Sequence, residues 1–107
     1  GDYTIRSDTK TIADHAFDYL SNVTGIIIPE GITHIPDSAF SVCKKLESLT
    51  IPVSVTSIGE MAVSRCNSLK GITYMGTIEQ WNSIDKVDGW NDTYYSRYII
   101  HCVDGDI

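Results

Sequence analysis

The most reactive side chains in this chain are three cysteines and three histidines, and the spacing of the cysteines favours a structural role. Cys43 and Cys66 stand 23 residues apart, and the position 23 residues before Cys43 is Leu20. A position that accepts either leucine or cysteine is typical of a small buried apolar slot. An odd number of cysteines argues against a domain held together by disulfides. A bridge between Cys43 and Cys66 stays open as the alternative, because stacked neighbours lie near the ~5–6 Å Cα separation that a disulfide needs.

The histidines do not complete a metal site or a nucleophilic pair. His15, His34 and His101 are far apart in the sequence, without the close His or Cys spacing of a zinc site. We expect His15 and His34 at the surface. His101 precedes Cys102, but adjacent residues of a strand point to opposite faces and cannot form a Cys–His dyad. There is also no glycine-rich phosphate loop. We therefore expect a protein without catalytic residues, metal or cofactor.

Composition and charge exclude further classes. With 107 residues, 42% of them hydrophobic and 21% charged, the chain is expected to form one globular domain. A net charge of −6 disfavours nucleic acid as a partner, and no apolar run approaches the ~20 residues of a membrane span. The start at Gly1 lacks the basic and apolar regions of a signal peptide, so we expect a processed or recombinant fragment.

The reactive residues belong to a repeat of 23 residues that must position them. Apolar residues recur in register along most of the chain. These columns are Ile5, Ile28, Ile51 and Tyr74; Ile12, Ile35, Ile58 and Trp81; Ala16, Ala39 and Ala62; Phe17, Phe40 and Val63; and Val23, Leu46 and Leu69. A period in the twenties with such columns indicates a solenoid, in which each repeat packs on its neighbours.

Each repeat is predicted to contain a strand followed by a short helix. Around Leu49–Ile51 and Ile72–Tyr74, apolar residues alternate with threonines, as in a half-buried strand, and a second short extended segment follows near Ile35. An acidic column (Asp14, Asp37 and Glu60) then precedes the Ala-Phe pairs. An acidic residue at this point is typical of a helix start, and the apolar residues after it have helical spacing.

The repeat resembles the BspA-like leucine-rich repeat of bacterial surface proteins. The copy at 51–73 carries the motif at Ile51, Pro52, Val55, Thr56, Ile58, Gly59, Ala62, Cys66, Leu69 and Ile72, and departs from it at Val63, where the family prefers phenylalanine. The resemblance implies a right-handed α/β leucine-rich repeat solenoid. It also implies a secreted or cell-surface bacterial protein with adhesion as its activity.

The repeat pattern fades after Tyr74. We place three repeats at 5–27, 28–50 and 51–73, and a partial repeat with a C-terminal cap at 74–107, all in one domain 1–107. Thr77 and Gln80 have the spacing of a capping box that opens a helix, and 98–102 is predicted to be the last strand. Trp90, Tyr94 and Tyr95 are the aromatic residues we expect to be exposed, although covering the end of the core is the alternative role for this region.

Function is expected on the surface that the strands turn outward. The candidate binding face comprises Ile27, Ser48, Thr50, Lys70 and Thr73, a shallow and mostly polar stripe suited to a protein partner such as a host extracellular protein. Two alternatives remain: a structural spacer in a longer stalk, and carbohydrate binding through the aromatic patch of Trp90, Tyr94 and Tyr95. The edge strand near Tyr3–Ile5 also predicts self-association through strand pairing.

Overall fold

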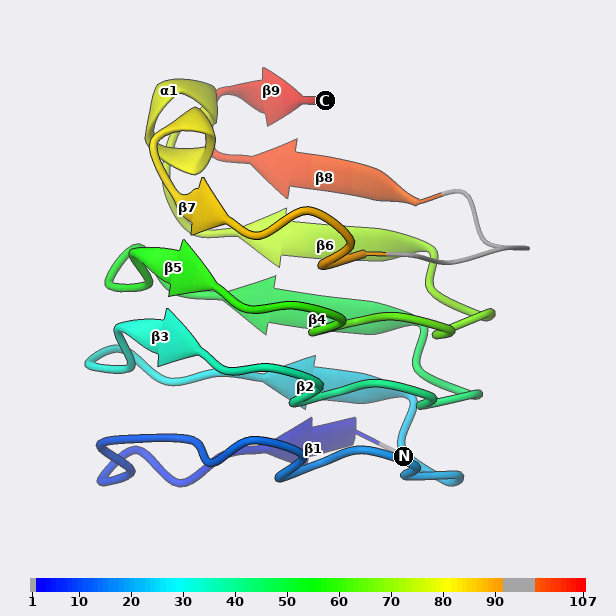
Figure 1. The fold of residues 1–107 in the computed structure, drawn as a ribbon. Coiled ribbons are helices and arrows are strands. Elements are labelled where there is room, and N and C mark those ends of the chain that lie inside the picture. The colour runs from blue at the N-terminus through cyan, green and yellow to red at the C-terminus, as the bar shows by residue number, and fades with distance from the viewer. Residues whose placement is uncertain (1, 92–97) are drawn as a thin grey trace.

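The chain winds into coils that stack on one another, with a strand of each coil lying beside the matching strand of the next (Figure 1). The computed structural model describes residues 2–91 and 98–107. One side of the stack is a six-stranded sheet in the order β1-β2-β4-β6-β8-β9, parallel except for its last pair. Its strands are β1 (Asp2–Thr4), β2 (Gly25–Ile27), β4 (Ser48–Ile51), β6 (Gly71–Tyr74), β8 (Ile99–Cys102) and β9 (Gly105–Asp106).

A second, smaller sheet lies in front of the first in Figure 1. It contains β3 (His34–Ile35), β5 (Ser57–Ile58) and β7 (Asp85–Lys86), all parallel. The predicted extended segment near Ile35 is thus confirmed as β3. Within the described part of the chain there is one helix, α1 (Ile78–Asn82), so this leucine-rich-type repeat is built mostly of strands rather than of the expected α/β mixture.

The 23-residue period sets the register of the central strands. Ile26 pairs with Leu49, and Leu49 pairs with Ile72. These three side chains are at most 1% exposed and form a continuous inner row. The outward neighbours alternate with them, as the period-two pattern predicts.

The period lengthens after Tyr74, and this corrects one column of the sequence alignment. Ser57 pairs with Asp85 and Thr73 pairs with His101, each 28 positions later. Trp81 does not continue the column of Ile58: Lys86 pairs with Ile58, and Trp81 lies in α1, where it is buried. The five residues of α1 account for the added length.

The helices predicted inside the repeats are wrong. The segment from Pro36 to Cys43 is a run of turns whose N–H groups bond to the next coil: Phe40 N–H donates to the Ala62 carbonyl at 2.8 Å, and Val42 N–H to that of Ser64 at 2.8 Å. A single helical turn would satisfy few backbone groups and costs nucleation entropy, whereas bonds to neighbouring coils satisfy every second residue.

The acidic column therefore does not start helices. The Asp37 carboxylate instead accepts the backbone N–H of Glu60, one coil later, at 2.8 Å. The Cys43 and Cys66 slot is confirmed as buried: both thiols are free and inaccessible, and each donates to a main-chain carbonyl, of Phe17 and Phe40 respectively.

The local signals near the C-terminus are confirmed. Thr77 caps α1 with the predicted capping box, because its hydroxyl accepts from Gln80 N–H while the Gln80 side chain accepts from Thr77 N–H. At the other end, the Lys86 ammonium donates to the carbonyls of Trp81 and Ile84 and lies 4.9 Å from the centre of the Trp81 ring. Strand β8 forms where the last strand was expected.

Candidate binding face

The outward face of the six-stranded sheet brings most of the predicted face residues into line. Ile27, Thr50 and Thr73 occupy one column across β2, β4 and β6, because they pair in register. Ser48 lies in the neighbouring outward column, between Gly25 and Gly71. The parallel ladder thus converts the 23-residue spacing into a row of adjacent side chains.

The chemistry of this row is small and polar around one apolar side chain. Ser48 and Thr73 are exposed, Thr50 is half-buried, and Ile27 is 43% exposed. The strand N–H and C=O groups are used by the sheet itself, so the face offers hydroxyls and one exposed isoleucine to a partner. It carries no nucleophile with a neighbouring base among these residues.

Lys70 flanks the face and is already paired. It directly precedes β6, and its ammonium lies 3.2 Å from a carboxylate oxygen of Glu47, the residue before β4. Both side chains are exposed, and such a pair contributes little to stability. Lys70 therefore offers a partner a charge that Glu47 largely balances.

Sequence reasoning missed His101 as a member of this face. His101 pairs with Thr73, and its Nδ1 lies 2.9 Å from Asp106 Oδ1 in β9. Its ring lies against Gly71, where an added Cβ would come within 3.2 Å of Nε2. The alternation in the last strand indicated which residues point outward, but the 28-residue step hid which column they join.

The aromatic patch is not brought together by the described residues. Trp90 is half-buried and packs edge-on against Trp81, with ring centroids 5.7 Å apart. Tyr94 and Tyr95 lie outside the described residues. Trp90 thus contributes to the covering of the core rather than to the exposed surface expected for it.

The remaining histidines and cysteines occupy separate places. His15 and His34 are exposed, as expected, and His34 hydrogen bonds through Nδ1 to the Ser57 hydroxyl in the next coil. The pKa of the Cys66 thiol is raised by its interaction with the Cys43 side chain and by burial. Burial, together with the carboxylates of Asp104 and Asp106, also raises the pKa of Cys102. A raised thiol pKa lowers reactivity near neutral pH.

Two searches of the described residues returned nothing. Across 2–91 and 98–107, no three His, Cys, Asp or Glu side chains converge as they would around a metal ion. In the same residues, no helix has the length and apolar character needed to cross a bilayer.

Comparison with known families decides the relationship. Residues 2–85 match the family described as the BspA-type leucine-rich repeat region, in six copies. The chain belongs to the BspA-type leucine-rich repeat family. This match includes β1 to β6, α1 and the first residue of β7, so the candidate face up to Thr73 is built from BspA-type repeats.

A solved relative is longer than this chain. The crystal structure of a leucine-rich cell surface protein from Faecalibacterium prausnitzii A2-165 matches at 25% identity and a TM-score of 0.47, over 78% of this chain and 34% of that one. The BspA-type chain thus spans about a third of the length of that protein. No curated protein matches it.

Proposed function

We propose that the chain is a non-enzymatic protein-binding module of a bacterial cell-surface or secreted protein, of the kind used in adhesion. Its contact surface is the outward face of the six-stranded sheet. The observation that carries the proposal is the alignment of Ile27, Thr50 and Thr73 in one exposed column. Membership of the BspA-type family supports the surface location, as does the printed description of the similar Faecalibacterium protein.

The composition of the face suits a broad protein contact. Exposed Ile27 supplies an apolar anchor, and the hydroxyls of Ser48, Thr50 and Thr73 supply hydrogen bonds around it. The side chains are short and the sheet is continuous, so a partner can approach closely along several coils. A host extracellular protein is the partner class we propose. The repeats at 5–27, 28–50 and 51–73 and the segment 74–107 act together as one domain that presents this face.

The test uses a panel of purified extracellular matrix proteins immobilised on a surface. The variant Ser48→Arg/Thr50→Arg/Thr73→Arg places three bulky cations on the face. Its matched control, Thr11→Arg/Thr33→Arg/Thr56→Arg, adds the same charge at exposed positions next to the smaller sheet. The proposal expects binding by the wild type and the control, and loss of binding in the strand-face variant.

Two results would overturn the proposal. Equal binding by both triple variants removes the strand face as the contact surface. Binding by none of the three proteins favours the alternative in which the repeats serve as a spacer in a longer stalk. The aromatic patch is left out of the proposal, because the Trp90 ring packs on Trp81 and its two tyrosines lie outside the described residues.

A further inference from the structure

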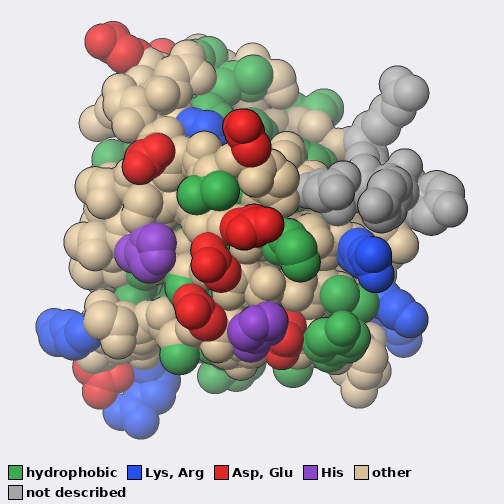
Figure 2. Space-filling view, viewed as in Figure 1, with side chains coloured by type: hydrophobic (Ala, Val, Ile, Leu, Met, Phe, Trp, Pro, Cys, Tyr) green, Lys and Arg blue, Asp and Glu red, His purple; other side chains and the backbone are tan. Residues whose placement is uncertain are grey.

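A second surface, on the turn side of the coils, contains a polar hollow of about 280 Å³. Among the residues that line it are Asp18 and Tyr19 from the first coil, Ser38 and Ser41 from the second, and Ser64 and Arg65 from the third. None of these belongs to the strand face proposed above. Figure 2 looks toward the front of the smaller sheet and the turns beside it, and acidic side chains gather in the middle of this view.

The hollow follows from the backbone of the turns. Residues in left-handed conformation recur at two positions of each coil, which places a row of side chains on either side of the row containing Asp18, Ser41 and Ser64. In the second coil the flanking side chains are short: Ser38 is buried and Val42 is half-buried. In the coils on either side they are larger and exposed, as with Tyr19, which is 71% exposed. The second coil therefore forms the floor of the hollow.

The serine hydroxyls of this floor are buried without full hydrogen bonding. Ser38, Ser41 and Ser64 are 7%, 6% and 5% exposed. Ser41 makes one long bond, 3.4 Å, to the Ser38 carbonyl. The hydroxyls of Ser38 and Ser64 make no hydrogen bond to any described residue, and both line the hollow. A buried hydroxyl without a partner costs about 1–3 kcal/mol, so these two groups favour a ligand that supplies donors or acceptors.

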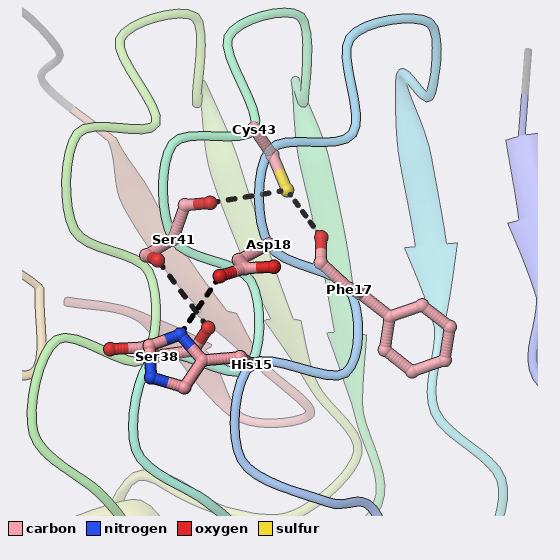
Figure 3. Close-up of polar contacts among 6 residues, drawn as sticks. All are labelled: His15, Phe17, Asp18, Ser38, Ser41 and Cys43. Atoms are coloured by element: carbon pink, nitrogen blue, oxygen red, sulfur yellow. Dashed lines mark hydrogen bonds and ion pairs between the residues drawn. The ribbon is translucent and has the colours of Figure 1, made fainter.

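Charged groups lie at the two ends of the floor. In the first coil, the Asp18 carboxylate lies 2.8 Å from His15 Nδ1, and the two side chains lie next to Ser38 (Figure 3). In the third coil, the exposed Arg65 guanidinium makes no ion pair with the described residues. The hollow thus offers an acceptor at one end, donors at the other and hydroxyls between, with Tyr19 and Met61 as apolar surface.

We propose that this hollow binds a single sugar residue of a glycan. A ring with several hydroxyls both donates and accepts, which matches the mixed set of carboxylate, guanidinium and unpartnered serines, and its C–H face suits Tyr19 and Met61. A phosphate fits less well, because Asp18 would repel it. An extended peptide would need free backbone groups, but the N–H groups of Tyr19, Ser38 and Val42 are already bonded to the next coil.

The experiment is an amide chemical-shift titration of the ¹⁵N-labelled chain with methyl α-mannoside, methyl β-galactoside, N-acetylglucosamine and inorganic phosphate. We expect at least one sugar to shift the amides of Ser38, Ser41, Ser64 and Arg65, while phosphate does not. Ser64→Ala is expected to weaken that sugar roughly three- to tenfold and to leave the melting temperature equal or higher, because it removes an unpartnered hydroxyl. Ser21→Ala, at an exposed position of the first coil, serves as the matched control and should change neither quantity.

Several outcomes overturn the proposal. Shifts caused by phosphate alone indicate an anion site, and the absence of shifts with all three sugars means that water alone occupies the hollow. Shifts confined to other residues, or equal affinity in Ser64→Ala, place the sugar elsewhere. Loss of matrix-protein binding in the strand-face variant does not bear on this result, since the two surfaces share no residue.

Discussion

Each coil bonds to its neighbours twice, once through the strands of the six-stranded sheet and once through the row of turns that includes 36–43. On the strand side the backbone is extended, and any outward side chain fits. On the turn side every second amide also reaches the next coil, but the chain must place residues such as Ser38 and Val42 in left-handed conformation, at φ of 55° and 56°. The strand side thus tolerates variation in its exposed residues, whereas the turn side depends on particular side-chain sizes and backbone angles.

The largest expected effect comes from the aromatic residue beneath the turns. Phe40 is fully buried and stacks on Phe17, with ring centroids 5.6 Å apart. Phe40→Ala should lower the free energy of unfolding by about 3–5 kcal/mol, because the space between the two sides of the coil is left unfilled. Phe17→Ala is the comparison variant and should cost clearly less, since Phe17 is half-buried. Urea unfolding measures both, and equal losses would show that the turn side does not enclose Phe40.

The tightness of the turn side is tested by its alanine column. Ala39 is fully buried and Ala16, its equivalent in the first coil, is exposed. Ala39→Leu should lose about 1–3 kcal/mol through overpacking, while Ala16→Leu should lose almost nothing. Thermal unfolding of the two variants gives the comparison. A stable Ala39→Leu protein would contradict the close packing described here.

A glycine substitution should have opposite signs on the two sides of a coil. Val42 is a β-branched residue held in left-handed conformation, so Val42→Gly should relieve strain and raise stability by about 1 kcal/mol. Thr50 lies in the central strand β4, where Thr50→Gly should lower stability by about 1 kcal/mol. Chemical denaturation of both variants decides the matter, and the same sign in both would show that the turn backbone is not strained at Val42.

The smallest effect is expected from a side chain that joins two coils. The Asp37 carboxylate accepts the Glu60 N–H, and Asp37→Ala should cost about 0.5–1 kcal/mol because that amide loses its partner. Asp14→Ala, in the same column of the first coil, should be neutral. Differential scanning calorimetry resolves such a difference, and an equal shift in both variants would assign the effect to net charge.

The strand side could be predicted from the sequence because its signals are local. Alternation around Leu49–Ile51 gave the inward and outward residues, the 23-residue period gave the register up to Tyr74, and the spacing of Thr77 and Gln80 gave the start of α1. The column of Ile27, Thr50 and Thr73 followed directly from these two periods.

The turn side could not be predicted in the same way. The spacing of Ala39, Phe40 and Cys43 fits one helical turn as well as a tight run of turns, and only the bonds to neighbouring coils distinguish them. None of the left-handed positions outside glycine is an asparagine or aspartate, so residue type gave no signal for them. The place of His101 depended on the five residues of α1 inserted before it.

Both candidate surfaces require that neighbouring coils be joined by backbone hydrogen bonds on the turn side as well as in the sheet. Scalar couplings across hydrogen bonds, measured by NMR on the labelled chain, test this claim directly. The structure predicts a coupling from the Phe40 amide to the Ala62 carbonyl carbon, and from the Val42 amide to that of Ser64. A coupling from the Phe40 amide to the carbonyl of Pro36, four residues earlier, would indicate a helix and contradict it.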